Sequence, residues 1–213
     1  MRRAAFLALA AVGLGLASGC GGSGKRSSPT KAYAPPPAAS TRAKPAATPG
    51  AAALQAEAAS AATGDIPDNQ VFLTFENRTV GYVIKYPEGW AQTGSGTMVS
   101  FRDKNNIVRV VVSNGSPPAV SSVANQLAGL RGVHITAQPV KTTVSGKPAI
   151  HAVYETRSAK SAVTGKSVTL GVDRYYLWNG KRVAIVDLGT PVAPVKVDNV
   201  DAYRLIVQSF RWR

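Results

Sequence analysis

The sequence predicts an α+β fold in which an antiparallel β-sheet is flanked by helices on both faces. Three observations lead to this prediction. Short segments rich in β-branched and aromatic residues dominate the C-terminal two thirds of the chain. Polar turns join several of them in the manner of hairpins, and only two segments carry apolar residues at helical spacing. Because the strands are grouped and do not alternate with helices, an antiparallel sheet is favoured over parallel βαβ units.

The first four strands are expected before residue 115. These segments are residues 71–75, 82–86, 97–103 and 107–114. Pro87 and Gly89 form a turn after the second segment, because Pro presets the bend and Gly accepts the conformation that closes it. Polar residues 104–106 join the third and fourth segments and indicate a hairpin.

Pro117 and Pro118 end this group of strands, and a helix is expected after them. Its apolar residues recur at helical spacing, at Val120, Val123, Ala124, Leu127 and Leu130. Gly132 follows at a position suited to end the helix.

The second half of the domain repeats the arrangement of strands followed by a helix. Four strands are expected at residues 134–144, 149–157, 167–178 and 181–189. Asn179-Gly180, a preferred hairpin pair, separates the last two. The final helix presents one apolar face, made by Val200, Tyr203, Val207 and Phe210.

The first 19 residues have the composition of an export signal. Arg2 and Arg3 precede an uncharged apolar run, residues 4–17, which is too short to span a bilayer core of about 30 Å. Small residues then lead to Cys20, the single cysteine of the chain. This order resembles the lipobox of bacterial lipoproteins, which implies cleavage before Cys20 and a diacylglyceryl group, with palmitate-type chains, on its sulfur. A conventional signal peptide with a chance cysteine is the alternative.

Two acyl chains hold a protein stably on a membrane, whereas one chain binds only reversibly. A lipidated Cys20 therefore places the protein on the extracytoplasmic face of the bacterial cell membrane. Residues 20–64 are rich in Ala, Pro, Gly and Ser and carry scattered basic residues, so we expect a disordered stalk. Residues 65–213 are long enough for one domain with its own core.

Positive charge is the main compositional signal. The chain has a formal net charge of +14, and residues 65–213 alone contain 18 Lys and Arg against 10 Asp and Glu. Such a surplus favours anionic lipid headgroups or anionic envelope polymers as partners. Nucleic acid is not expected, because the protein is predicted to be exported and no recognition motif is present.

Several segments of the domain together resemble the PsbP-like family. They are GYVIKYPEGW at residues 81–90, the following VSFRD, the strand pair TVSGKPAIHAVYE, and the closing helix into SFRW. The family includes an extrinsic photosystem protein and LpqN-type bacterial lipoproteins. The resemblance implies an α/β/α sandwich that binds or helps to assemble other macromolecules. It carries no shared catalytic residues to positions of this chain.

The sequence offers no catalytic set, so we expect a non-enzymatic protein without a cofactor. The two histidines, His134 and His151, are separate in the sequence, and a metal site usually needs three or more ligands. TGKS at residues 164–167 imitates the end of a phosphate-binding loop, but Lys160 stands where the first glycine is required, and a strand follows where a helix must begin. Asp198 and Asp201 begin the last helix, where acidic residues stabilise the helix dipole.

Two groups of residues are candidates for ligand or partner binding. The first is basic and consists of Arg157, Lys160, Lys166, Arg174, Lys181 and Arg182, which form one patch if their loops share an end of the sheet. The second is aromatic and consists of Trp90, Tyr176 and Trp178, which would edge a pocket between sheet and helix. Separate solvated charges and ordinary core packing are the alternatives.

Three functions are consistent with these observations. The leading hypothesis is a non-enzymatic lipoprotein that presents its domain for contacts with a protein or an envelope component. The alternative is a carrier for a small apolar or anionic ligand. A cell-wall hydrolase or transferase is disfavoured, because no nucleophile and base are recognisable.

Overall fold

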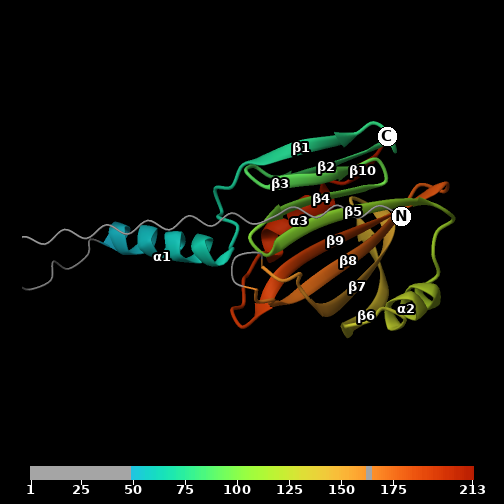
Figure 1. Cartoon of the computed structure of the whole chain (residues 1–213). Helices are drawn as coiled ribbons and strands as arrows, with labels where there is room; N and C mark the ends of the chain where they lie inside the picture. Colours follow the sequence, from blue (N-terminus) through green and yellow to red (C-terminus); the bar gives the residue numbers. More distant parts are fainter. Residues whose placement is uncertain (1–48, 162–164) are drawn as a thin grey trace, which may run out of the picture. The chain divides into compact units, whose positions relative to one another are not determined.

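The computed structural model describes residues 49–161 and 165–213 (Figure 1). The expected signal peptide, Cys20 and the expected stalk up to residue 48 lie outside the described residues. The last part of the expected stalk is helix α1 (Pro49–Thr63). Eight of its 15 residues are alanine, the residue with the highest helix propensity, which favours a helix in this part of the chain.

Antiparallel β-structure makes up most of the domain. The larger sheet has seven strands in the order β3-β4-β5-β9-β8-β7-β6. In chain order they are β3 (Ala91–Ser95), β4 (Met98–Asp103), β5 (Asn106–Asn114), β6 (Val133–Val144), β7 (Lys147–Arg157), β8 (Thr169–Trp178) and β9 (Arg182–Ala193). Every neighbouring pair is antiparallel, so the predicted α+β class with an antiparallel sheet is confirmed.

A second, three-stranded sheet corrects the expectation of a single sheet. It contains β1 (Phe72–Asn77), β2 (Tyr82–Pro87) and β10 (Arg211–Trp212) in the order β1-β2-β10 (Figure 1). Tyr82 and Ile84 of β2 are each 1% exposed and belong to the same apolar cluster as residues of β4, β5 and β9. The small sheet therefore packs its apolar side chains on the large sheet instead of extending its edge.

Two strands, β3 and β10, are not predicted by the sequence. All five residues of β3 are exposed, so the segment lacks the alternation of apolar and polar residues that marks a half-buried strand. β10 has only two residues, Arg211 and Trp212, which pair with Val83 and Tyr82. β3 forms by pairing with the neighbouring β4, and β10 forms by pairing with the distant β2. Neither segment has a pattern of apolar residues that predicts a strand.

Two further helices lie where apolar spacing predicts them. Helix α2 (Val120–Ala128) buries Val123 and Leu127, and helix α3 (Val200–Gln208) buries Tyr203, Ile206 and Val207. No described helix is long and apolar enough to cross a membrane.

Successive residues of β9 divide between two apolar clusters because side chains alternate across a strand. Val186 and Leu188 join α3 and the small sheet in the first cluster, and the face that carries them is called the core face. Val183 joins α2 in the second cluster, and its face is called the pocket face. Asp187, which lies between Val186 and Leu188 in the chain, is directed to the pocket face and is 2% exposed.

Candidate binding site

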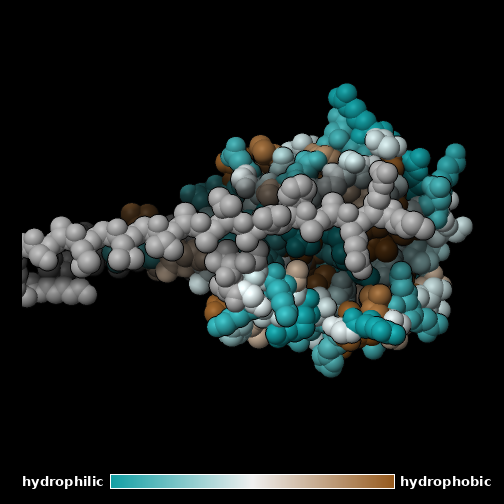
Figure 2. Space-filling view, in the orientation of Figure 1, coloured by the Kyte–Doolittle hydropathy of each residue, from teal (hydrophilic) through white to brown (hydrophobic). Residues whose placement is uncertain are grey.

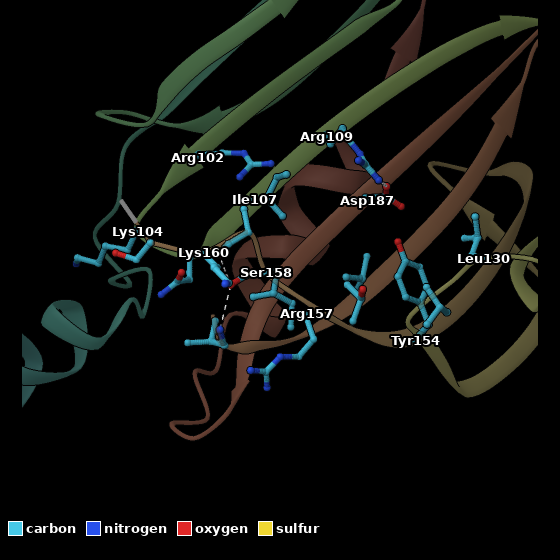
Figure 3. A pocket seen from close by; sticks show the side chains of 18 of the residues that line it. Arg102, Lys104, Ile107, Arg109, Leu130, Tyr154, Arg157, Ser158, Lys160 and Asp187 are labelled. Carbon is cyan, nitrogen blue, oxygen red and sulfur yellow. Dashed lines mark hydrogen bonds and ion pairs between the residues drawn. The ribbon is translucent and has the colours of Figure 1, made fainter. Parts of the chain in front are cut away.

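A cavity of about 850 Å³ opens on the pocket face (Figure 3). Its lining combines side chains of β4, β5, β7, β8 and β9 with residues of the loops before β5, β6 and β8. Eight cationic residues line it: Arg102, Lys104, Arg109, Arg131, Arg157, Lys160, Lys166 and Arg174. Among the described residues, Asp187 is its single carboxylate. The cavity is therefore strongly positive.

A row of charged side chains crosses three strands at the inner end of the cavity. Arg109 of β5 lies opposite Asp187 of β9, which lies opposite Arg174 of β8. Arg174 Nε donates to Asp187 Oδ1 at 2.6 Å and its Nη2 donates to Oδ2 at 2.9 Å. Arg109 donates to Oδ2 from Nε at 3.1 Å and from Nη2 at 2.5 Å. One carboxylate therefore holds two guanidinium groups, and the row keeps one net positive charge.

The two arginines of this row differ in burial. The side chain of Arg174 is 8% exposed, that of Asp187 is 3% exposed, and that of Arg109 is 36% exposed. Burial alone would lower the pKa of Arg174, but the hydrogen bonds and the charge of Asp187 outweigh burial and raise the pKa. Arg174 is a fixed cation bound by Asp187, whereas Arg109 still presents part of its side chain to the cavity.

Tyr154 of β7 completes the inner end. Its hydroxyl accepts a hydrogen bond from Arg174 Nη2 at 3.0 Å, and Arg174 Cζ lies 5.1 Å from the centre of its ring. Burial, followed by the negative charge of Asp187, raises the pKa of Tyr154 to about 12. The hydroxyl therefore stays protonated at neutral pH.

Apolar residues separate this charged row from the end of the sheet. Two residues along the strands from the charged row, Ile107 of β5 pairs with Gly189 of β9. Gly189 pairs in turn with Val172 of β8. A Cβ at Gly189 would come 2.6 Å from Ile107 Cγ2. The absence of a side chain at Gly189 therefore leaves room for Ile107 to pack over the backbone of β9. Leu170 continues the apolar lining toward the start of β8 and is 8% exposed. These four residues are called the apolar band.

A second group of cations lies at the outer end of the cavity, where β8 begins. Arg157, at the end of β7, donates from Nη2 to the carbonyl oxygen of Ser167 at 3.3 Å and to the hydroxyl of Ser167 at 3.0 Å. Lys160 and Lys166 follow in the loop between β7 and β8, and both are exposed. Figure 3 shows Lys160 near Lys104 at one end of the cavity and Arg109 beside Asp187 at the other, with Ile107 between them.

Figure 2 shows hydrophilic side chains along the upper and lower parts of the visible surface of the domain, with patches of hydrophobic surface among them.

The cavity brings together four of the basic residues selected from the sequence: Arg157, Lys160, Lys166 and Arg174. The structure separates Lys181 and Arg182 from them. Both lie at the turn after β8, whereas the loop carrying Lys160 precedes β8, so the two segments are at opposite ends of that strand. Arg182 Nη1 instead donates to the carbonyl oxygen of Val80 at 2.7 Å.

The three aromatic candidates do not line the cavity. Trp90 is 8% exposed and packs in the cluster of the core face. Tyr176 is 2% exposed and donates from its hydroxyl to Gln126 Oε1 of α2 at 2.8 Å. Trp178 packs against the α2 cluster. These positions have the contacts of ordinary core residues, because an aromatic side chain buries a large area wherever helix and sheet meet.

The sequence interpretation missed six residues of the cavity: Arg102, Lys104, Arg109, Arg131, Tyr154 and Asp187. Two of them carried a usable signal. Arg109 is the single charge within IVRVVV, and Asp187 is the single charge within VAIVDLG. A lone charge inside an apolar strand must find a partner, because an unpaired buried charge is costly. The pattern predicts a buried ion pair, but it does not reveal which charges meet.

The histidines do not contribute to this cavity. His151 Nε2 lies 2.7 Å from Asp173 Oδ1, and its ring stacks on Tyr175 at 4.4 Å between centres. Within the described chain, no group of three or more His, Cys, Asp or Glu residues is arranged to hold a metal ion. Asp201 near the start of α3 pairs with Arg204 at 2.7 Å.

The site geometry and the fold define an α+β domain with a basic cavity of ligand size. No family model matches the sequence. No curated protein matches it either.

Solved structures of similar fold have low sequence identity to this chain. Cyanobacterial PsbP (CyanoP) of Synechocystis sp. PCC 6803 is 16% identical, with a TM-score of 0.46, and the match covers 70% of this chain and 98% of that one. LpqN of Mycobacterium tuberculosis, involved in cell envelope biogenesis, is 13% identical, with a TM-score of 0.39 and coverage of 67% and 91%.

A Bacteroides thetaiotaomicron protein is 10% identical, with a TM-score of 0.45. The match covers 66% of this chain and 48% of that protein, so the chain spans about half its length.

Proposed function

We propose that this chain is an exported, membrane-anchored binding protein whose domain takes up an anionic ligand without catalysing a reaction. The observation that carries the proposal is the cavity of about 850 Å³ with eight cations and, among the described residues, one carboxylate. Its volume lies in the range of small-ligand sites. Arginine and lysine recognise carboxylate and phosphate through charge-assisted hydrogen bonds, which are about twice as strong as neutral ones.

The geometry favours the carrier function over presentation of the domain to a protein partner. A protein interface needs a broad surface with an apolar centre, whereas this site is concave and positively charged. An anionic group of an envelope polymer would use the same contacts as a free small anion. The α/β/α sandwich of PsbP-like proteins is part of this proposal, and the packing of α2 and α3 in separate clusters supports it.

Titration with inorganic pyrophosphate tests whether the cavity binds anions. We expect saturable binding by isothermal titration calorimetry that weakens as salt concentration rises, because screening reduces the attraction. Lys160→Gln should reduce the affinity several-fold, because Lys160 lines the cavity. Lys181→Gln is the matched control, since it removes the same charge from the turn at the opposite end of β8.

Native mass spectrometry of protein purified from membranes provides an independent measurement. A retained small anion that is lost in Lys160→Gln but kept in Lys181→Gln would support the carrier. Absence of any retained anion, together with no pyrophosphate binding or with equal binding by the two variants, would contradict it.

Membrane anchoring is tested separately at Cys20. Cys20→Ser should release the protein from the membrane or leave an unprocessed precursor, because serine cannot carry the thioether-linked lipid. Fractionation followed by mass measurement of the mature N-terminus checks both outcomes. Normal processing and membrane retention of Cys20→Ser would contradict lipid anchoring and leave the anion-binding proposal untouched.

A further inference from the structure

The cavity has two cationic groups separated along the strands. The inner group consists of Arg109 and Arg174 around Asp187, and the outer group consists of Arg157, Lys160 and Lys166. Arg174 and Thr169 are five residues apart on β8, and Thr169 pairs with Arg157, after which the loop carrying Lys160 begins. Because a strand rises about 3.3 Å per residue, the inner group lies roughly 16 Å from the start of the outer group. The two groups are too far apart to bind one compact anion.

The apolar band occupies the floor between them. Ile107 is 8% exposed, Val172 4% and Leu170 8%, and Gly189 adds no side chain. None of these side chains offers a hydrogen-bond donor or acceptor to a ligand. Arg102 lies beside the band on β4, opposite Ile107, and Arg131 lines the cavity from the loop before β6. A ligand that reaches both cationic groups therefore crosses an apolar floor with cations at its sides.

Each cationic group has the capacity to contact an anion. In the inner group, one net positive charge remains after Asp187 is counted, and Arg109 is the accessible member because its side chain is 36% exposed. In the outer group, Lys160 lines the cavity and is exposed, so its ammonium group is the accessible member.

We infer that the cavity takes an elongated ligand that carries an anionic group at each end and an apolar segment between them. This inference rests on the proposed anion-binding function and adds the charge pattern and length of the ligand. One anionic group contacts Arg109 in the inner group, and the other contacts Lys160 in the outer group. The apolar segment lies on Ile107, Val172 and Leu170.

A series of α,ω-alkane bisphosphonates tests both the charge pattern and the length. Short, intermediate and long spacers are compared by calorimetry with alkyl monophosphonates of matched chain length and with inorganic pyrophosphate. We expect an affinity maximum at the spacer that spans roughly 16 Å, because that length places a phosphonate at each group. The best bisphosphonate should bind at least about tenfold more tightly than its matched monophosphonate, because the second contact forms within the complex.

Variants at the two ends provide a second measurement. Arg109→Gln and Lys160→Gln should each reduce the affinity for the best bisphosphonate toward that of the monophosphonate, whereas Lys181→Gln should leave it unchanged. If Arg109→Gln impairs folding, Lys160→Gln and the spacer series still test the inference. Pyrophosphate is short enough to bind one group alone. Because Lys160→Gln is expected to weaken pyrophosphate binding, Arg109→Gln should retain most of the affinity for pyrophosphate.

The outcomes separate this inference from the proposed function. Equal affinities across the spacer series, or tighter binding of monophosphonates than of matched bisphosphonates, would overturn the two-ended ligand while anion binding remains. A compact anion or a single-headed amphiphile would then be the ligand class. If no phosphonate and no pyrophosphate bind, the proposed function fails together with the inference.

Discussion

The two faces of the large sheet use the same strands but bury very different side chains. On β9, Ala184, Val186 and Leu188 are at most 1% exposed and pack on the core face. On the opposite face, Asp187 is equally inaccessible but joins two arginines. The adjacent residues Asp173 and Arg174 of β8 also separate in this way, toward the core face and the pocket face.

This difference shows that the pocket face holds charges at a cost in stability. Apolar side chains at the positions of Arg109, Asp187 and Arg174 would provide burial without the loss of hydration that charges suffer, and replacing buried ion pairs in this way is often neutral or stabilising. Charge at these positions is therefore consistent with our proposal that the cavity binds an anionic ligand. The core face has apolar contacts throughout its centre, and the pocket face has a second apolar cluster beside α2.

The largest expected effect comes from removing the carboxylate of the pocket face. Asp187→Asn leaves Arg174, and much of Arg109, without a compensating charge in a buried environment. Loss of one partner from a buried pair costs about 3–5 kcal/mol, so we expect the free energy of unfolding to fall by an amount in this range. Urea denaturation followed by tryptophan fluorescence measures the change.

Asp173→Asn is the matched control for this variant. The side chains of Asp173 and His151 are 42% and 25% exposed, so their pair is well solvated. Exposed pairs contribute at most about 1 kcal/mol, and we expect a loss within that limit. If both asparagine variants lost the same small amount, the charged row would be solvated and the contrast between the faces would not hold.

Local sequence patterns account for most of the fold but for only part of the site. Helices α2 and α3 and eight of the strands are readable because their apolar residues repeat at the spacing of the element. The basic loop residues Arg157, Lys160 and Lys166 are also readable, because they are clustered in the sequence.

The charged row is not readable in this way. Arg109, Arg174 and Asp187 belong to three strands that are far apart in the sequence, and they meet only because β9 pairs with both β5 and β8. The register of those pairings depends on the packing of the whole sheet, since a slip of one residue would move each charge to the other face. The division into two sheets has the same origin, because β2 pairs with the C-terminal β10, which is more than 120 residues away.

A smaller effect than that of Asp187→Asn is expected from Tyr154, whose titration tests how well the pocket face excludes water. Tyr154→Phe removes the hydroxyl that accepts from Arg174, so we expect a loss of about 1 kcal/mol at pH 7. The pKa of Tyr154 is raised from its ordinary value of 10.0 to about 12, which means that the folded state favours the neutral phenol. Its contribution is complete below pH 10 and is lost between pH 10 and pH 12.

The wild-type protein should therefore lose stability relative to Tyr154→Phe over that range, by about 2 kcal/mol in total. Urea denaturation at several values between pH 7 and pH 12 measures the difference between the two proteins. Because the other buried tyrosines titrate in both, they cancel from this difference. Parallel stability profiles for the two proteins would mean that Tyr154 is solvated and that the inner end of the cavity is as open to water as its outer end.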